Sequence, residues 1–146
     1  MGETVAVAES CTGGFLGHHI TAIPGASAVF VGGIISYSNE LKHKLLDVKN
    51  DTLEKHGAVS KAVALEMAEG ARAVTGADHT LSVTGIAGPG GGSTKKPVGT
   101  VWLGLASAGE RPLAVKKHHP YNRETFKQAS VNQSLELLRR RIQRHS

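Results

Sequence analysis

The stretch AESCTGG, residues 8–14, holds a serine and a cysteine followed by two glycines. The alternating residues 4–8 before it predict a short buried strand, and residues 15–20 after it fit a helix. Such a turn puts free backbone N–H groups and the positive end of a helix dipole at the carboxyl edge of a sheet. Anionic or polar ligands bind there, and Ser10 could act as a nucleophile. The alternative is structural: Thr12 caps the helix, and the glycines let strand and helix pack closely.

Lys42 is the candidate base for such a nucleophile. It lies one helical turn beyond Tyr37, at the carboxyl end of the second predicted strand. If the first two strands are parallel neighbours, Lys42 and Ser10 share one edge of the sheet. A partly buried lysine has a lowered pKa and, when neutral, can take a proton from a serine hydroxyl. The alternative is a solvated lysine on a helix surface.

Other chemistries find less support in the sequence. The glycine-rich loop at 85–92 matches neither the P-loop nor the dinucleotide fingerprint, which leaves a loop that lines or closes a site, or an ordinary connection. The eight histidines include two adjacent pairs, whose side chains point apart, and no metal-binding spacing occurs, so we expect no metal. Cys11 could be a nucleophile, but no cationic residue lies beside it in sequence.

Composition limits the class of protein. A chain of 146 residues with 40% hydrophobic residues is expected to form one globular domain. It has no apolar run of membrane-spanning length and no leader pattern, and its single cysteine suits a reducing compartment, so we expect a cytoplasmic protein without membrane contact. The net charge of +5 gathers near the end of the chain. That charge fits a solvated helix face better than nucleic-acid binding, because the basic run lacks interleaved aromatic residues.

The elements that must position these groups follow from periodicity and turn residues. Strands are predicted over residues 4–8, 29–37, 79–84, 98–106 and 113–118. Helices are predicted over residues 15–20, from Ser38 or Asn39 to 46, over 51–56, between Ser60 and Gly76, and from Asn122 to 142. This order predicts a single α/β domain with a mixed sheet and helices on both of its faces.

Several motifs together resemble one known family. They are ESCTGG at 9–14, PGAS at 24–27, FVGGIISYSNELK at 30–42, HGAVS at 56–60, and TGIAGPGGG with KPVGTVW within 84–102. In this order and spacing they are similar to the CinA carboxy-terminal domain family, the PncC-type nicotinamide mononucleotide deamidases. The resemblance runs from about Thr4 into the last helix.

The resemblance implies a three-layer α/β/α sandwich that hydrolyses the carboxamide of nicotinamide mononucleotide to nicotinate mononucleotide and ammonia, without a cofactor. It implies Ser10 as nucleophile and Lys42 as base, with Tyr37 as a third catalytic residue. The residues that it implies for substrate binding are Thr12, Gly13, Ser27, Thr84, Gly85 and Arg123. Backbone N–H groups near Thr12 or Thr84 would hold the oxyanion, and Arg123 would pair with the phosphate. We also expect a homo-oligomer.

Two features depart from the family pattern. The family has a helix before its first strand, whereas this chain starts almost on that strand, so we expect residues 1–146 to be a fragment of a longer two-domain protein. The family's Gly-Asp-Arg-Glu segment reads Tyr-Asn-Arg-Glu at 121–124. Two other functions remain open: a non-catalytic nucleotide-binding or regulatory module, and a nucleic-acid-binding domain that uses the basic final helix.

Overall fold

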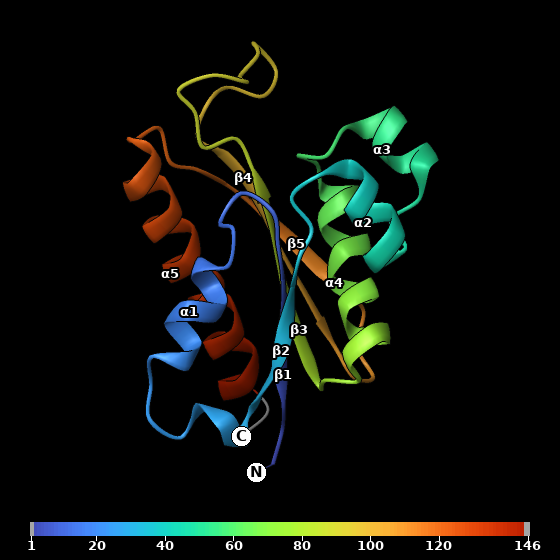
Figure 1. Ribbon diagram of the computed structural model, residues 1–146, viewed down its shortest axis with the longest axis vertical. Coiled ribbons are helices and arrows are strands. Elements are labelled where there is room, and N and C mark those ends of the chain that lie inside the picture. Colours follow the sequence, from blue (N-terminus) through green and yellow to red (C-terminus); the bar gives the residue numbers. More distant parts are fainter. Residues whose placement is uncertain (1, 145–146) are drawn as a thin grey trace.

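The computed structural model describes residues 2–144, and a five-stranded mixed sheet runs through the middle of this part of the chain (Figure 1). In spatial order its strands are β2 (Phe30–Ile35), β1 (Val5–Glu9), β3 (His79–Gly85), β4 (Thr100–Ser107) and β5 (Leu113–His118). β1 pairs in parallel with both β2 and β3, whereas β4 runs antiparallel to β3 and β5. The predicted mixed sheet is confirmed.

Helices cover both faces of the sheet, which confirms the three-layer α/β/α sandwich (Figure 1). One face carries α1 (Phe15–Thr21) and α5 (Arg123–Arg144). The other carries α2 (Asn39–Leu46), α3 (Asn50–His56) and α4 (Lys61–Thr75). A short 3-10 turn, η1 (Ala26–Ala28), precedes β2. No helix within residues 2–144 is both long and apolar enough to cross a membrane.

Alternation along β1 divides the core between the two faces, because successive side chains of a strand point to opposite sides. Val7 joins Leu16 and Phe126 in the cluster under α1 and α5. Ala8 joins the cluster under α2 and α4, which includes Met67. Each fully buried side chain of the size of Leu, Met or Phe contributes roughly 1.5–3 kcal/mol to folding.

The approach of α2 to α4 depends on a glycine. A Cβ atom placed at Gly70, in the middle of α4, would overlap the backbone carbonyl group of Leu46 at the end of α2. A residue that weakens helices elsewhere is therefore required here. The close approach fixes the position of α2, whose first turn carries Lys42.

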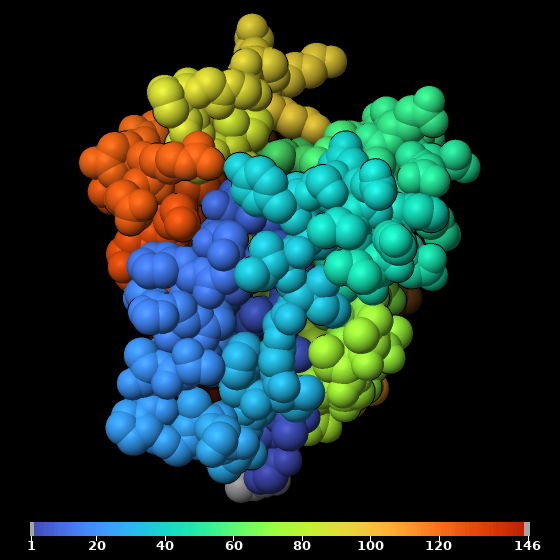
Figure 2. All heavy atoms as spheres, viewed as in Figure 1, coloured from blue at the N-terminus to red at the C-terminus, as the bar shows by residue number. Residues whose placement is uncertain are grey.

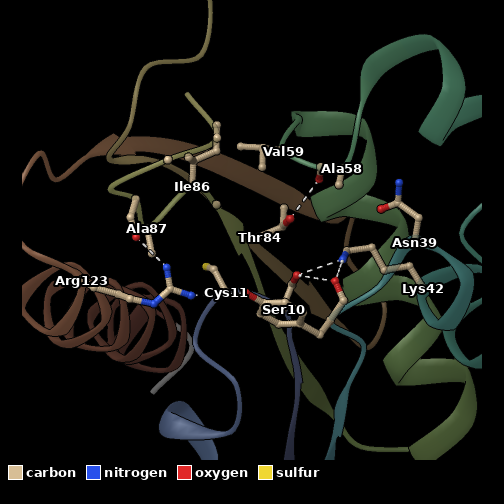
Figure 3. Close-up of a pocket in the computed structure, with 15 residues that line it drawn as sticks. Ser10, Cys11, Asn39, Lys42, Ala58, Val59, Thr84, Ile86, Ala87 and Arg123 are labelled. Atoms are coloured by element: carbon tan, nitrogen blue, oxygen red, sulfur yellow. Dashed lines mark hydrogen bonds between the residues drawn. The ribbon is translucent and has the colours of Figure 1, made fainter. Parts of the chain in front are cut away.

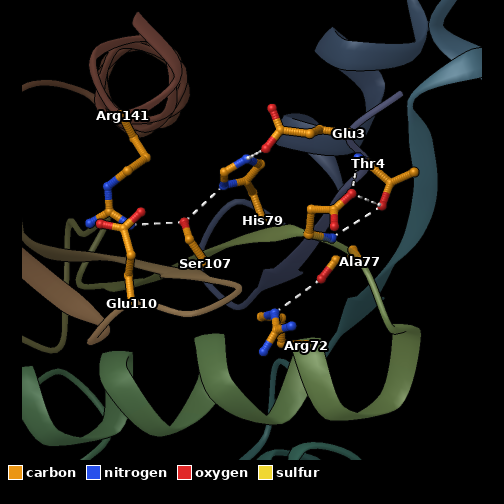
Figure 4. A network of polar contacts seen from close by, with 9 residues as sticks. Glu3, Thr4, Arg72, Ala77, His79, Ser107, Glu110 and Arg141 are labelled. Atoms are coloured by element: carbon orange, nitrogen blue, oxygen red, sulfur yellow. Dashed lines mark hydrogen bonds and ion pairs between the residues drawn. The ribbon is translucent and has the colours of Figure 1, made fainter. Parts of the chain in front are cut away.

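A polar network fastens α5 to the sheet at the amino ends of β1 and β3 (Figure 4). Buried Arg141 donates to the Ser107 hydroxyl at 2.8 Å. The ring of His79 lies 2.8 Å from that hydroxyl and 3.1 Å from a carboxylate oxygen of Glu3. These contacts lie at the end of the sheet opposite Ser10, so they stabilise the scaffold.

The topology marks the opposite edge as the place for a ligand. The chain passes from β1 to β2 through α1 on one face, and from β2 to β3 through α2, α3 and α4 on the other. The direction of winding therefore switches at β1, and open α/β sheets bind ligands outside the carboxyl ends of their strands at such a switch point. Ser10 directly follows β1 at this edge.

Candidate active site

A cavity of about 270 Å³ opens at the carboxyl ends of β1, β2 and β3, close to the lower end of the usual range for small-molecule sites. The glycine-rich loop between β3 and β4 rises above it at the top of the molecule (Figures 1 and 2). The lining residues are Ser10, Cys11, Tyr37, Asn39, Lys42, Ala58, Val59, Thr84, Gly85, Ile86, Ala87, Gly88, Gly90, Gly91 and Arg123. Most of the residues predicted for the site are among them.

Ser10 and Lys42 meet at the floor of this cavity (Figure 3). The Nζ of Lys42 lies 2.9 Å from Oγ of Ser10, and it also donates to the carbonyl oxygens of Ser36 at 2.9 Å and Tyr37 at 3.0 Å. Only 1% of Lys42 and 7% of Ser10 is exposed. Three acceptors satisfy the three donors of an ammonium group, and a neutral amine in the same place can accept the serine proton.

The local sequence explains how Lys42 reaches this position. β1 and β2 are parallel neighbours, so their carboxyl ends lie at one edge, as predicted. The hydroxyl of Ser38 caps α2 by accepting the N–H of Leu41 at 3.1 Å, which starts the helix immediately after β2. Lys42 then lies one turn into α2, and its long side chain extends back to the sheet edge (Figure 3).

Burial sets the protonation of the two candidate groups beside the serine. Loss of solvation lowers the pKa of Lys42 from 10.5 to about 8, and no carboxylate among residues 2–144 forms an ion pair with it. A substantial fraction is therefore neutral near pH 8. Burial raises the pKa of the Cys11 thiol to about 12, so this thiol stays protonated and is a poor nucleophile. The serine and the lysine are therefore the candidate catalytic pair.

The start of α1 does not offer free N–H groups to a ligand, and that prediction is wrong. The carboxylate of Glu9, the last residue of β1, accepts the N–H groups of Gly14 at 3.2 Å, and of Leu16 and Gly17 at 2.9 Å. This buried carboxylate already occupies the position of an anion at the helix terminus. Glu9, and not Thr12, is the cap of the helix.

Thr12 and Gly13 are not brought to the cavity as the resemblance implied. The hydroxyl of fully buried Thr12 donates to the Glu9 carboxylate at 2.5 Å. The N–H of Gly13 is donated to the carbonyl of Ser10 at 3.1 Å. Both residues support the turn that presents Ser10, and neither faces the cavity.

Ser27 lies at the other end of the sheet. It belongs to η1, which precedes β2, whereas the cavity lies beyond the carboxyl end of that strand. Six strand residues at about 3.3 Å each separate the two places by roughly 20 Å. Ser27 therefore does not reach the cavity of its own chain.

Thr84 and Gly85 both line the cavity at the end of β3. The Thr84 hydroxyl donates to the carbonyl of Ala58 at 2.9 Å, which ties the strand end to the segment before α4 (Figure 3). A Cβ at Gly85 would lie only 2.8 Å from the carbonyl oxygen of Thr100. Glycine at this position lets β4 approach closely, which is its structural role.

Arg123 spans the mouth of the cavity from the first turn of α5. It donates to the Gly88 carbonyl of the glycine-rich loop at 2.6 Å and to the Tyr37 hydroxyl at 3.3 Å. Five residues of that loop line the cavity, which agrees with the interpretation of the loop as part of a site: Ile86, Ala87, Gly88, Gly90 and Gly91. Lys96, further along the loop, donates to the His56 carbonyl at 2.5 Å and so anchors it to α3.

The sequence prediction missed some residues that line the cavity. Asn39, the first residue of α2, faces it, as do Ala58 and Val59 (Figure 3). Asn39 could have been predicted from the sequence, because the first residue of a helix that directly follows a strand lies near the carboxyl end of that strand. The 58–59 segment gave no such signal, since only folding brings it beside β3.

This part of the chain is thus a three-layer α/β protein with a serine–lysine pair at the switch point of its sheet. The sequence matches the model of the CinA C-terminal domain over residues 1–142, and the chain belongs to that family. It is 51% identical over 142 residues to a CinA-like protein of Parasynechococcus marenigrum, and 46% identical over 138 residues to one of Thermotoga maritima. These matches cover 97% and 94% of this chain, which spans about one third of the length of each relative, 34% and 33%.

Solved structures agree with this assignment. The competence/damage inducible protein of Agrobacterium tumefaciens superposes with a TM-score of 0.91 at 42% identity, over 94% of this chain and 84% of that one. A competence-damaged protein (CinA) superfamily member of Escherichia coli gives a TM-score of 0.89 at 34% identity, over 94% of this chain and 79% of the other. The fold expected from the resemblance is confirmed.

Proposed function

We propose that the protein is an amidohydrolase that converts nicotinamide mononucleotide to nicotinate mononucleotide and ammonia, with Ser10 as nucleophile and Lys42 as base. The contact of 2.9 Å between Lys42 Nζ and Ser10 Oγ carries this proposal. A lysine that is 1% exposed, has no acidic partner among the described residues, and has a pKa of about 8 is suited to accept a serine proton near neutral pH.

The charges around the cavity support a substrate of this kind. Lys42 and Arg123 contribute to its lining, and no carboxylate side chain of residues 2–144 does. A guanidinium at the mouth can bind a phosphate through two parallel hydrogen bonds. The positive pyridinium ring of the substrate, bound near Lys42, would favour the neutral amine. A mononucleotide can place its phosphate at Arg123 and its amide at Ser10, with its pyridinium ring near neutral Lys42.

The reaction follows from the positions of these groups. Neutral Lys42 takes the proton of Ser10 as the serine oxygen bonds to the amide carbon. The tetrahedral intermediate then collapses, its C–N bond breaks, and the proton on Lys42 passes to the leaving nitrogen, which departs as ammonia. Water, deprotonated by the same lysine, hydrolyses the acyl-serine and restores both residues. The pyridinium withdraws electrons and makes the carbonyl carbon easier to attack.

Backbone groups next to the nucleophile can hold the developing oxyanion. Cys11 lines the cavity, and among the described residues its N–H is donated to no other residue. Cys11 directly follows Ser10, the place from which many serine hydrolases draw an oxyanion donor. Removing one such donor typically costs about 10²–10³ in rate.

Rapid acid quenching followed by intact-mass measurement tests the covalent scheme. During turnover of nicotinamide mononucleotide we expect an acyl adduct on the wild-type chain that maps to Ser10, and none on Ser10→Ala. Lys42→Ala should lose the adduct, whereas Lys44→Ala, at an exposed position of the same helix, should keep it. Turnover without an adduct at any quench time would favour direct attack by water over a covalent intermediate. Turnover that persists in Ser10→Ala would remove Ser10 from the mechanism.

A further inference from the structure

Side chains hold the glycine-rich loop between β3 and β4 on both sides of the cavity. Figure 1 shows this loop, in yellow, above the carboxyl ends of the parallel strands. On the α5 side, Arg123 donates to the Gly88 carbonyl at 2.6 Å. On the opposite side, Lys96 of the loop donates to the carbonyl of His56, the last residue of α3, at 2.5 Å. The position of the loop over the cavity therefore depends on contacts at both of its sides.

Internal contacts join the loop into one unit. At its base, the N–H of Gly99 is donated to the carbonyl of Ile86 at 2.8 Å. At its tip, the N–H of Ser93 is donated to the carbonyl of Lys96 at 2.9 Å, and the N–H of Lys96 to the Ser93 hydroxyl at 3.0 Å. The side chain of Val98 packs inside the loop, so close to the backbone that a Cβ atom placed on either of two loop glycines would overlap it. A contact at the tip therefore restrains the whole loop, including the residues that line the cavity.

The end of α3 is suited to receive the ammonium group of Lys96. The last carbonyl groups of a helix lack a donor within the helix, and the helix dipole favours a cation beside them. His56 carries such a carbonyl. Gly57, the next residue, leaves room for the ammonium, because a Cβ atom placed on it would lie only 3.1 Å from Lys96 Nζ. Ala58 and Val59 follow and line the cavity, so Lys96 ties the loop to one of the cavity walls.

We propose that Lys96 is a positioning residue, whose bond to the His56 carbonyl holds the glycine-rich loop closed over a nucleotide bound at Ser10. The identity of the nucleotide rests on the proposed function, whereas the tether itself does not. Lys96 is half-buried and does not line the cavity, so it acts through the loop. Without its bond the loop spends part of its time open, and the apparent affinity for a ligand falls in proportion to the closed fraction.

The candidate catalytic pair does not depend on the loop. Ser10 follows β1, Lys42 lies on α2, and their contact of 2.9 Å involves no residue of the loop. Loss of the tether should therefore weaken binding more than it slows the chemical step. Lys95 offers a matched control, because it is the adjacent lysine of the same loop, is exposed, and forms no side-chain hydrogen bond or ion pair with another residue of 2–144.

The reactivity of Cys11, the only cysteine of the chain, reports the position of the loop in the free protein. This residue is 7% exposed and lines the cavity together with the loop. At a fixed pH, Lys96→Met should react with iodoacetamide about fivefold faster than the wild type, because opening the loop no longer breaks a charged hydrogen bond. Lys95→Met should react at the wild-type rate. Equal rates in the wild type and Lys96→Met, with all three proteins folded by circular dichroism, would overturn the proposal.

Steady-state kinetics with nicotinamide mononucleotide test the effect of the tether on the site. We expect Lys96→Met to raise KM about fivefold and to keep kcat within about twofold of the wild type, and Lys95→Met to change neither. An unchanged KM in Lys96→Met would overturn the proposal. So would a raised KM without faster alkylation of the free protein, because Lys96 would then bind the nucleotide directly. Faster alkylation of Lys96→Met together with a wild type that releases no ammonia would support the tether and refute the proposed function.

Discussion

Replacing Lys42 with methionine should change the pH dependence of folding in a defined way. In the folded chain burial lowers the pKa of Lys42 from 10.5 to about 8, and unfolding restores the ordinary value. Below about pH 8 the lysine is protonated in both states, so the wild type carries the full cost of burying the charge. A shift of this size corresponds to about 3 kcal/mol of unfolding free energy. Between pH 8 and 10.5 the unfolded state binds more protons, so this stability is recovered as the pH rises.

The methionine variant lacks this titration. The difference in unfolding free energy, variant minus wild type, should be most positive below pH 7 and should fall by roughly 2–3 kcal/mol by pH 10. Methionine also loses the hydrogen bonds of Lys42 to Ser10, Ser36 and Tyr37. Loss of these hydrogen bonds shifts the difference in unfolding free energy by a nearly constant amount at every pH, so the dependence of that difference on pH is unchanged. Burial raises the pKa of Cys11 to about 12, and loss of the Lys42 charge would raise it further, so the thiol stays protonated in both folded proteins and a comparison that ends at pH 10 is little affected.

Urea unfolding from pH 6 to pH 10 measures this difference. Lys44→Met is the matched control, because Lys44 lies on the same helix with its side chain exposed. Its unfolding free energy should follow the wild type across the range. A Lys42→Met difference that is independent of pH, or that grows as the pH rises, would refute the assignment of a lowered lysine pKa.

Three further predictions concern other parts of the structure. The kcat/KM of amide hydrolysis should rise with pH through an apparent pKa of about 8, because this ratio reports the free enzyme, in which neutral Lys42 is the base; a kcat/KM that falls across that range would exclude it. Glu9→Ala should lower the unfolding free energy by about 2–4 kcal/mol, since it leaves three N–H groups of α1 without their acceptor; urea unfolding that matches the wild type would contradict this role. Gly70→Ala should destabilise the fold although alanine favours helices by about 1 kcal/mol, because its Cβ would overlap the carbonyl group of Leu46. A higher melting temperature for that variant would show that α2 and α4 can move apart.

The shared sheet edge of Ser10 and Lys42 could be predicted from topology, whereas their roles as nucleophile and base came from the family resemblance. Ser10 and Lys42 each follow a strand, and parallel neighbouring strands end at the same edge of a sheet. The fold class could also be predicted, because apolar periodicity and turn residues indicate the strands and helices along most of the chain. The second strand was predicted to reach Tyr37, whereas it ends at Ile35, because Ser36 and Tyr37 already turn toward α2.

Other features had no local signal. The AESCTGG motif does not show whether the N–H groups at the start of the helix are free to bind a ligand or are already bonded to Glu9. The Glu9 carboxylate accepts from Leu16 and Gly17, seven and eight residues further along the chain, and only the folded structure shows these contacts. Ser27 could have been placed correctly, since a residue just before a strand lies at the amino edge and Ser10 lies at the carboxyl edge. The family resemblance did not separate the two edges of the sheet, because a shared motif does not say where a residue lies in the fold.

Release of ammonia from nicotinamide mononucleotide by the purified chain tests the proposed function most directly. We expect ammonia and nicotinate mononucleotide in equal amounts from the wild type and from Lys44→Ala. We expect none above background from Lys42→Ala or Ser10→Ala, with all four proteins folded by circular dichroism. A folded wild type that binds the nucleotide and releases no ammonia, or a Ser10→Ala variant that releases it at the wild-type rate, would contradict the proposed function.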